Sequence, residues 1–496
     1  MPFITALQTD GQPVEFEDRP LNAGGEKVVF RTRDRAHVVG FFYGALRDRL
    51  ERVDRLNRIL TKYNPTVGPR GVFWAPYFCW PVGVIDGDRR VPADFVRRHG
   101  LVHPVLGVVT PAYREAFYFR DTFGNRQEKE VRWFTGRKAS AFVPAAEKGS
   151  FLTRLQICTR LARAVRRLHF AGLAHSDLSN KNVLVDPRGG DACVIDIDSL
   201  VVPGVAPPAV LGTPGYIAPE VVAGRGQPSI EADKHALAVL VYELLLQRHP
   251  LAGRKVHSTR SPEEDEALSM GDRALWVEHP TDRSNPPVYP IKVPVARLGP
   301  FLEALFRKAF VDGLHHPARR PDAAEWESAL YRTLHTLHPS PARGEWFPTG
   351  PGLSTRCPFT GERLARPVPV ARFLRPTPAG LADERGWLTV FHHLVLHDWH
   401  HRVGVAPDEH ADRTPRGYFS LHDGRWWMVN LASEPMEVLA RGGGDARTDA
   451  AGEADAAASA GTLVAQHGAL ELVPGLRVRL APSPDARVLH FDFLRA

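Results

Sequence analysis

One segment near the middle of the chain restricts the fold more than any other. Residues 234–246 read KHALAVLVYELLL, which is apolar on nearly every side of a helix. A helix of this kind must be covered by protein all round, as in the centre of a large domain. The chain of 496 residues is long enough for two to four structural units, one of which must surround this helix.

The periodicity of apolar residues predicts the elements around this helix. Residues 14–43 read as strands about a glycine turn, an amphipathic helix follows from Leu46 to Leu60, and residues 72–119 again read as strands. Helical patterns return at 151–171, 300–311 and 322–337. A small sheet followed by helices predicts an α+β domain of two lobes.

The composition changes after residue 337. Residues 338–385 are rich in proline and glycine and are predicted to be a linker, whereas 386–496 contains short β-like runs and a hairpin signal at Asp423-Gly424. These runs predict a small all-β, sandwich-like domain with a low-complexity loop at 441–461. The predicted boundaries are therefore 14–113 and 114–337 for the two lobes, 338–385 for the linker and 386–496 for the β domain.

The charge and composition argue against nucleic acid and membrane as partners. The net charge is +7, and five arginines that alternate with apolar residues are interpreted as a solvated helix face. These are Arg47, Arg49, Arg52, Arg55 and Arg58. The four cysteines are far apart, as expected of reduced, buried thiols. No run reaches the ~20 apolar residues of a membrane helix and the N-terminus lacks a signal-peptide pattern, so a cytoplasmic location is expected.

Two short segments carry the residues that point to chemistry. They read HSDLSNKNVLVD at 175–186 and VIDIDSL at 194–200. Phosphoryl transfer needs a carboxylate beside the attacking hydroxyl and oxygen ligands for Mg²⁺ near the phosphates. Asp177, Asn182 and Asp196 would supply them, although an Asp/Asn-rich turn between two strands would read similarly.

These segments resemble the catalytic loop and the metal-binding segment of protein kinases. GTPGYIAPEV at 212–221 looks like the end of the activation segment and the substrate-docking loop of that family, and Asp233 and Arg320 stand where the family has its buried aspartate and the arginine that pairs with Glu220. The resemblance implies a two-lobed kinase fold that uses ATP and Mg²⁺. By the same resemblance, Asp177 serves the acceptor hydroxyl, and Asn182 and Asp196 hold the metal.

The glycine-rich loop of that family is similar to LNAGGEKVVF at 21–30. By this resemblance the loop residues and the strand that follows contact ATP through Asn22, Gly24, Gly25, Lys27 and Val29. Gly40 occupies the place of the usual ATP-binding lysine. Lys27 stands at the third glycine, where the with-no-lysine kinases carry their lysine. Lys27 is therefore the candidate phosphate-binding lysine, the alternative being a solvated lysine on a hairpin.

Other positions of the resemblance remain open. The helix glutamate that orients the lysine would be Glu51 first and Asp54 second, and both would read equally well as surface charges. The adenine-binding hinge is expected near 107–113, with Val108 or Val109 as gatekeeper and the backbone from Thr110 to Ala112 contacting the base. Ser176 and Ser179 replace an arginine and a lysine of the family, and Asp198 replaces a glycine; Asp198 could supplement metal binding or be a solvated or capping residue.

Within the protein kinases, the sequence looks like a bacterial family associated with tellurium-resistance-type gene clusters. That resemblance rests on I-D-x-D-S, the G-G-E loop, WPVGV at 80–84 and ALWVEHPTDRSNPP at 274–287. It implies a von Willebrand A-domain protein and a metal-dependent protein phosphatase as partners. Cys357 lacks the second thiol of a zinc knuckle, so no structural zinc is expected. The C-terminal β domain could be a forkhead-associated-like module or a packing domain.

Three functions follow from these residues. The first is a Ser/Thr kinase acting on a partner protein, and the second is a pseudokinase scaffold, favoured by Gly40, Ser176 and Ser179. The third is a small-molecule phosphotransferase, against which GTPGYIAPE argues.

Overall fold

The computed structural model describes residues 3–44, 48–87, 90–208, 212–342, 344–440 and 461–495. The chain separates into two compact units. The first comprises 1–149, 153–291 and 304–328, and the second comprises 150–152, 292–303 and 329–496. The candidate site lies in the first unit.

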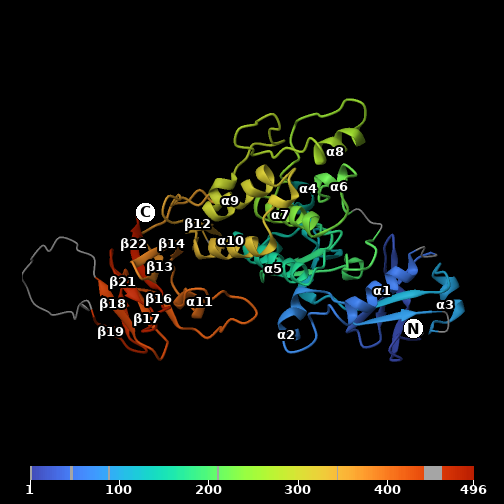
Figure 1. Cartoon of the computed structure of the whole chain (residues 1–496), viewed down its shortest axis with the longest axis horizontal. Coiled ribbons are helices and arrows are strands. Elements are labelled where there is room, and N and C mark those ends of the chain that lie inside the picture. Colours follow the sequence, from blue (N-terminus) through green and yellow to red (C-terminus); the bar gives the residue numbers. More distant parts are fainter. Residues whose placement is uncertain are drawn as a thin grey trace, which may run out of the picture. The chain divides into compact units, whose positions relative to one another are not determined.

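The first unit begins with a six-stranded antiparallel sheet, drawn in blue in Figure 1. In spatial order its strands are β1 (Phe3–Leu7), β2 (Pro13–Ala23), β3 (Lys27–Thr32), β4 (His37–Phe42), β6 (Leu106–Pro111) and β5 (Gly83–Asp86). Because side chains alternate across a strand, Phe41 and Phe42 of β4 enter different cores. Phe41 packs with Phe95 of helix α3 (Ala93–Arg98), and Phe42 packs with Leu56 of helix α1 (Arg49–Leu60). The two helices thus cover opposite faces of the sheet.

The prediction of strands throughout 72–119 is correct only in part. Strands β5 and β6 lie there, but so do α2 (Gly71–Trp74), the turn at Ala75–Tyr77 and α3. The aromatic residues in this stretch stack on one another, with the rings of Phe73 and Tyr77 5.4 Å apart, instead of alternating across a sheet. Short apolar runs of this kind fit a helix or a strand equally well, and the tertiary contacts determine which of the two forms.

The helical part of the first unit surrounds the long apolar helix, as predicted. Helix α7 (Ile230–Leu246) is capped by the Ser229 hydroxyl, and nearly all its residues from Asp233 onward are buried. Tyr242 of α7 meets the Phe306 ring edge-on at 5.2 Å. The other helices are α4 (Arg137–Ser140), α5 (Phe151–Phe170), α6 (Pro219–Val222), α8 (Pro262–Met270), α9 (Pro300–Arg307) and α10 (Ala323–His335). Parts of α5, α9 and α10 belong to the second unit. Helices at 151–171, 300–311 and 322–337 are confirmed, the second ending as a π-helical turn, Lys308–Asp312.

Two small hairpins complete this unit. One consists of β7 (Tyr118–Arg120) and β8 (Arg126–Glu128). The other consists of β9 (Val183–Asp186) and β10 (Asp191–Val194), whose paired residues include Val183 and Val194. The predicted site residues Asn182 and Asp196 flank this second hairpin, so the pairing of β9 with β10 brings their backbones together.

The prediction that the arginine-rich face of α1 is solvated is wrong. Arg55 is 1% exposed and donates a 2.7 Å hydrogen bond to the Ala206 carbonyl, while Arg58 donates to the Pro203 carbonyl at 3.1 Å. Arg49 pairs with Asp86. The helical spacing directs Arg55 and Arg58 toward segment 203–206, whose carbonyls accept their hydrogen bonds. Arg47 lies outside the described residues.

Removing the Arg55 side chain is therefore expected to destabilise the protein. Arg55→Ala deletes a charged hydrogen-bond donor from a buried position, which costs about 2 kcal/mol. Urea unfolding of the full chain, followed by tryptophan fluorescence, measures the loss. Arg19 is an exposed arginine on β2 and supplies the control, Arg19→Ala. Equal midpoints for the two variants would contradict the burial of Arg55 against segment 203–206.

The second unit contains two antiparallel sheets that enclose one apolar core. The larger sheet has the order β14 (Gly380–Thr389), β13 (Val368–Thr377), β22 (Val488–Leu494), β21 (Arg477–Arg479), β18 (Met436–Ala440) and β19 (Leu463–Val464). The smaller has β15 (Val395–Leu396), β16 (Gly417–His422), β17 (Arg425–Asn430) and β20 (Ala469–Glu471). Asp423 and Gly424 join β16 to β17, both with positive φ, which confirms the predicted hairpin.

The β domain begins earlier than predicted, because β13 and β14 lie within the expected linker 338–385. The proline content of this stretch led to the prediction of a linker. Pro369 and Pro376 nevertheless lie within β13, where they pair with Phe493 and Leu381. The same stretch holds β11 (Leu337–Pro339) and β12 (Trp346–Pro348), and α11 (Asp398–His401) follows β15. The predicted loop at 441–461 falls almost wholly outside the described residues.

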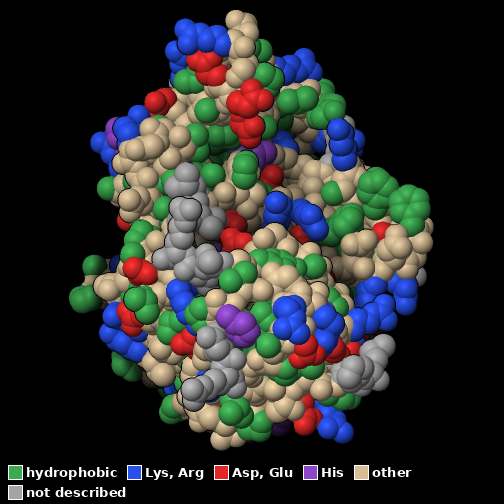
Figure 2. Space-filling view, turned by 90° about the vertical axis from the view of Figure 1, so that its right-hand side faces the viewer, with side chains coloured by type: hydrophobic (Ala, Val, Ile, Leu, Met, Phe, Trp, Pro, Cys, Tyr) green, Lys and Arg blue, Asp and Glu red, His purple; other side chains and the backbone are tan. Residues whose placement is uncertain are grey.

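Cys357 packs in a small apolar cluster with Phe347 and Leu364. All four cysteines are buried and free, in agreement with the prediction of reduced thiols. On the face drawn in Figure 2, lysine and arginine side chains are interspersed with aspartate and glutamate. In the described part of the chain no helix is both long and apolar enough to cross a bilayer.

Candidate active site

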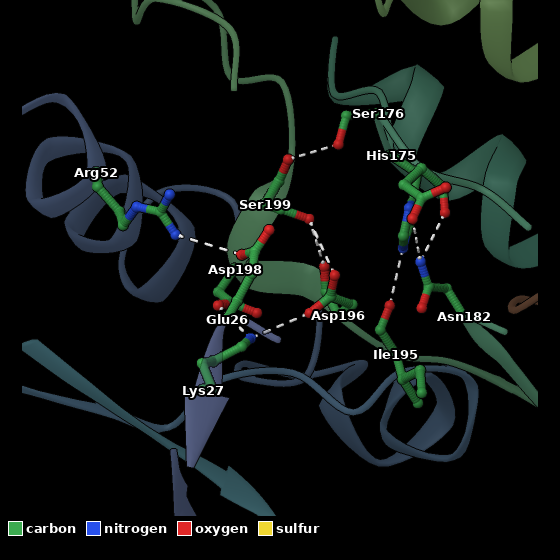
Figure 3. Close-up of polar contacts among 11 residues, drawn as sticks. Glu26, Lys27, Arg52, His175, Ser176, Asn182, Ile195, Asp196, Asp198 and Ser199 are labelled. Carbon is green, nitrogen blue, oxygen red and sulfur yellow. Dashed lines mark hydrogen bonds and ion pairs between the residues drawn. The ribbon is translucent and has the colours of Figure 1, made fainter. Parts of the chain in front are cut away.

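Lys27 begins β3, directly after the glycine turn, and its side chain enters a cleft (Figure 3). Its ammonium nitrogen lies 3.1 Å from Oδ1 of Asp196 and 2.7 Å from Oδ2 of Asp198. Burial lowers the pKa of Lys27, but the carboxylates of Asp198 and Asp196 more than offset this and raise the pKa above its usual value. The lysine therefore brings a permanent positive charge into the cleft.

The path of this side chain depends on Gly40. In the register of β3 with β4, Lys27 faces Phe42 and Val29 faces Gly40. A Cβ atom at residue 40 would lie 3.6 Å from Cδ of Lys27, in van der Waals contact with it. The lysine stem thus passes over Gly40, and the ammonium lies 5.1 Å from the centre of the Phe42 ring. A long side chain at residue 40 would compete with Lys27 for this space.

Asp177 and Asn182 are held together in one loop. The Asn182 amide nitrogen donates to the backbone oxygen of Asp177 at 2.8 Å and to its Oδ2 at 3.0 Å. The backbone N–H of Thr213 donates to Oδ1 of Asp177 at 2.6 Å. Both carboxylate oxygens of Asp177 are thereby oriented, and the loop is tied to the predicted docking segment at 212–221.

His175 and Ser176 fix this loop to the buried helix and to the next segment. The backbone N–H of His175 donates to the carboxylate of Asp233 on α7 at 2.6 Å. The ring Nε2 of His175 lies 2.8 Å from the Ile195 carbonyl oxygen. The Ser176 hydroxyl donates to the Ser199 carbonyl at 2.9 Å. A neutral hydrogen bond therefore replaces the charged contact that an arginine at residue 176 would offer.

Asp196 adopts the left-handed conformation, with φ of 61°, and a short 3-10 turn, Ile197–Ser199, follows it. This turn is closed by the Ser199 hydroxyl, which donates to the Asp196 carbonyl at 3.0 Å. Burial raises the pKa of Asp196, but the nearby Lys27 cation outweighs that effect and holds the pKa below its usual value. Asp196 is thus an ionised carboxylate beside a cation.

Lys27, Asp196 and Asp198 line a cavity of about 420 Å³, a volume typical of small-molecule sites. Asp177 and Asn182 are not part of its wall. Its wall includes residues from the glycine hairpin, β3, β4, the end of β6 and the 3-10 turn, among them Leu21, Asn22, Lys27, Val29, Gly40, Val108, Thr110, Ala112, Asp196 and Asp198. Of the two gatekeeper candidates, Val108 faces the cavity and Val109 packs in the opposite core. Gly24 and Gly25 form the exposed turn before β3 and are not part of the cavity wall.

Asn182 and Asp196 also fit a divalent cation. Asn182 uses its amide nitrogen for both bonds to Asp177, which leaves its amide oxygen to face a metal. The backbone N–H of Ile195 donates to the backbone carbonyl of Asn182 at 3.0 Å, so the backbone segments that carry the two candidate ligands lie side by side. Among the described residues no three His, Cys, Asp or Glu side chains form a metal cage. A pair of protein oxygens is what Mg²⁺ uses when phosphates and water complete its shell.

The predicted acidic partner of Lys27 on α1 is wrong. Glu51 is exposed, and Asp54 forms a 3.0 Å ion pair with Arg58. The partners of Lys27 are instead Asp196, which precedes the 3-10 turn, and Asp198, which lies within it. The reading of Asp198 as a solvated residue is likewise excluded, because it is only 6% exposed.

Sequence reasoning missed several residues at the cavity mouth. Tyr118, Arg126 and Glu128 of the β7–β8 hairpin line it, and the Arg126 guanidinium lies 3.7 Å from the centre of the Tyr118 ring. Nothing in the local sequence marks this hairpin as part of a site. Only its position after the predicted hinge could have drawn attention to it.

A comparison with family models matches residues 147–298 to the protein kinase domain. The matched segment contains Asp177, Asn182, Asp196 and residues 212–221, and it starts after the sheet that carries Lys27 and Gly40. The chain is therefore similar to protein kinases over the part that holds the 175–182 loop, and Lys27 lies outside the match.

The curated proteins to which part of this chain is similar are also named as serine/threonine-protein kinases. Serine/threonine-protein kinase pkn3 of Myxococcus xanthus is 28% identical over 182 residues, 34% of this chain and 29% of the relative. Serine/threonine-protein kinase PkaA of Streptomyces coelicolor is 29% identical over 151 residues, 28% of each chain. The probable serine/threonine-protein kinase CCRP1 of Zea mays is 34% identical over 107 residues, 20% of this chain and 16% of the relative. The chain thus spans less than a third of the length of these relatives.

Proposed function

We propose that this protein is a serine/threonine protein kinase that transfers the γ-phosphoryl group of ATP to a partner protein in a Mg²⁺-dependent reaction. The observation that carries the proposal is the meeting of Lys27 with Asp196. A cation from the glycine hairpin and a carboxylate from a distant segment lie 3.1 Å apart at the wall of a nucleotide-sized cavity. The protein kinase match over 147–298 supports the same chemistry.

Each residue has a distinct part in this proposal. Lys27 binds the α- and β-phosphates, since its charge is fixed and its stem is guided over Gly40. Asn182 and Asp196 would hold Mg²⁺, which neutralises charge on the phosphates as the bond to the γ-phosphorus breaks. Asp177 orients the acceptor hydroxyl and takes its proton, because both its oxygens are fixed by neighbouring donors.

The acceptor side is organised by segment 212–221. The N–H of Thr213 reaches Asp177, and the hydroxyl of Tyr216 donates to the buried Glu243 of α7. His249 lies 2.8 Å from the Gly215 carbonyl through its Nε2. These contacts hold the segment next to Asp177, which supports a protein substrate docking there over a small-molecule acceptor.

Gly40, Ser176 and Ser179 keep a pseudokinase scaffold as the second candidate. One structural observation favours it: the Ser176 hydroxyl donates to the Ser199 carbonyl at 2.9 Å, so a neutral hydrogen bond stands where an arginine would make a charged contact. Against it, the sequence retains Asp177, Asn182 and Asp196 together, which a scaffold does not require. A nucleotide-binding protein without turnover would bind ATP yet show no labelled product.

The C-terminal unit and the partners are further proposals. The two-sheet sandwich supports a forkhead-associated-like module, whose ligand would be a phosphothreonine captured by arginine. Arg402 and Arg416, next to α11, both pair with the buried Asp398, which favours a packing role instead. A von Willebrand A-domain protein and a metal-dependent phosphatase as partners rest on the resemblance of the kinase part to tellurium-cluster kinases.

The proposal is tested by replacing Lys27. Lys27→Ala is expected to lower kcat/KM for ATP about 10²-fold, the size of effect seen when one charged donor to a transition state is removed. The assay follows transfer of label from γ-labelled ATP to the protein itself and to casein. Lys62→Ala, an exposed lysine beyond α1, is the control. Activity of Lys27→Ala equal to that of wild type would overturn the relocation of the lysine.

A further inference from the structure

Asp198 is a buried carboxylate in an unusual place. It lies in the middle of the Ile197–Ser199 turn, and its side chain is 7% exposed, compared with 36% for Asp196. Burying a charged carboxylate is costly unless a cation compensates it. The cation is Lys27, whose nitrogen lies 2.7 Å from Asp198, closer than the 3.1 Å to Asp196 (Figure 3).

Helix α1 offers a cation on this side of the cleft. Arg52 lies over the Phe42 ring at 4.6 Å and approaches Glu26 at 3.9 Å. Since Lys27 lies 5.1 Å from the same ring, the two cations flank Phe42. A second positive charge cannot orient an ammonium group by attraction. Helix α1 contains two acidic residues, Glu51 and Asp54. Glu51 is exposed, and Asp54 pairs with Arg58 instead of Lys27.

The turn that carries Asp198 is itself fixed at both ends. The Ser199 hydroxyl donates to the Asp196 carbonyl at 3.0 Å, and the Ser199 carbonyl accepts from Ser176 at 2.9 Å. The first bond closes the turn on itself, and the second ties it to the 175–182 loop. The carboxylate of Asp198 is therefore held against Lys27 by backbone that is anchored to the loop of Asp177.

We infer that Asp198 is the positioning residue of Lys27, doing from the turn after Asp196 what a glutamate on α1 would otherwise do. This inference rests on the proposed function of Lys27. The two carboxylates then divide the work: Asp198 stays buried and keeps the ammonium aimed at the phosphates, while the more exposed Asp196 is free to turn to the metal. Positioning of the lysine depends on the turn, and α1 contributes no acid to it.

Asp198→Asn tests the inference, because it removes the charge and keeps the shape. We expect kcat/KM for ATP to fall about tenfold, mainly through a higher KM, since the lysine loses its orientation in the nucleotide site. Binding of a fluorescent ATP analogue, measured without turnover, should weaken by a similar factor. Asp198→Glu should recover part of the loss. Glu51→Gln and Asp54→Asn, which alter the two acids of α1, are the controls and should behave as wild type.

The link through Lys27 is tested by a double-variant cycle with Lys27→Met. If Asp198 acts by positioning the lysine, Asp198→Asn causes no further loss of analogue binding in the Lys27→Met background. If the losses of analogue binding in the two single variants multiply in the double variant, the inference is overturned. A raised Mg²⁺ requirement of Asp198→Asn that persists in the Lys27→Met background would overturn it too. Either result would make Asp198 an independent ligand. Wild-type binding by Asp198→Asn would overturn it as well.

Two outcomes separate this inference from the proposed function. If Lys27→Met itself keeps full activity, the proposed function of Lys27 fails. If Lys27→Met is inactive and Asp198→Asn is normal, only the positioning role fails. Should Asp198→Asn unfold, as judged by circular dichroism, Asp198→Glu replaces it in the cycle. It keeps the charge but moves it by one methylene, so a partial loss of affinity for the analogue is expected, and that loss should vanish in the Lys27→Met background. A partial loss that persists without the lysine would overturn the inference.

Discussion

Replacing Asp177 by alanine is expected to lower kcat about 10³-fold while leaving the affinity for ATP nearly unchanged. The reason is the location of this carboxylate. It is held by Asn182 and by the N–H of Thr213, on the side of the docking segment, and it is not part of the cavity wall. Loss of Asp177 therefore removes the group that serves the acceptor hydroxyl and leaves the nucleotide contacts in place. Labelled-ATP transfer and binding of a fluorescent ATP analogue measure the two quantities separately.

Asp177→Asn separates chemistry from structure in this experiment. The amide keeps an oxygen to accept the 2.6 Å hydrogen bond from Thr213, but its NH2 group cannot accept the bond that Asn182 donates to Oδ2. Asn182 still donates to the backbone oxygen of residue 177, so the loop should stay in place, and the amide cannot take a proton. Asp94→Ala, an exposed aspartate on α3, is the matched control. If Asp177→Asn transferred phosphate at the wild-type rate, the role given to Asp177 would be wrong. If wild type itself bound ATP without any transfer, the scaffold would be the better description.

The parts of the fold that could be predicted are those set by local pattern. Helix α7 was predictable because apolar residues on every side of a helix require burial whatever the neighbours are. The β16–β17 hairpin was predictable because Asp423-Gly424 supports the two positive φ values of its turn. The loop with Asp177 and Asn182 was predictable because its residues lie within five positions of one another.

The remainder depended on contacts between distant segments. Lys27 and Asp198 are 171 positions apart, and no spacing rule joins them, so the acid was sought on the nearby helix at Glu51 or Asp54. Arg55 had the spacing of a solvated face, and only the approach of segment 203–206 made it buried. In β13, prolines that usually break strands were accommodated within the ladder. Local pattern gives the elements, whereas burial of charge is decided by what packs against them.

The second large effect is expected for Arg320, whose side chain is 1% exposed. Its guanidinium donates to both oxygens of Glu220, at 2.8 and 2.7 Å, and to the carbonyls of Gly313, Leu314 and Glu231. All five N–H groups of an arginine are thereby used. The Glu220–Arg320 pair predicted from the sequence thus forms part of a network that joins the end of segment 212–221 to the turn before α10.

Arg320→Ala is expected to cost about 3–5 kcal/mol of unfolding free energy, because it leaves a partly buried carboxylate without its cation and three carbonyls without a donor. Urea unfolding of the full chain measures the change. Arg320→Lys should recover only a part, since a single ammonium cannot form the two parallel bonds to Glu220. The double variant Arg320→Met, Glu220→Leu should be more stable than Arg320→Ala, because no charge remains buried. A cost below about 1 kcal/mol for Arg320→Ala, typical of an exposed ion pair, would show that the network contributes little to holding the docking segment beside Asp177.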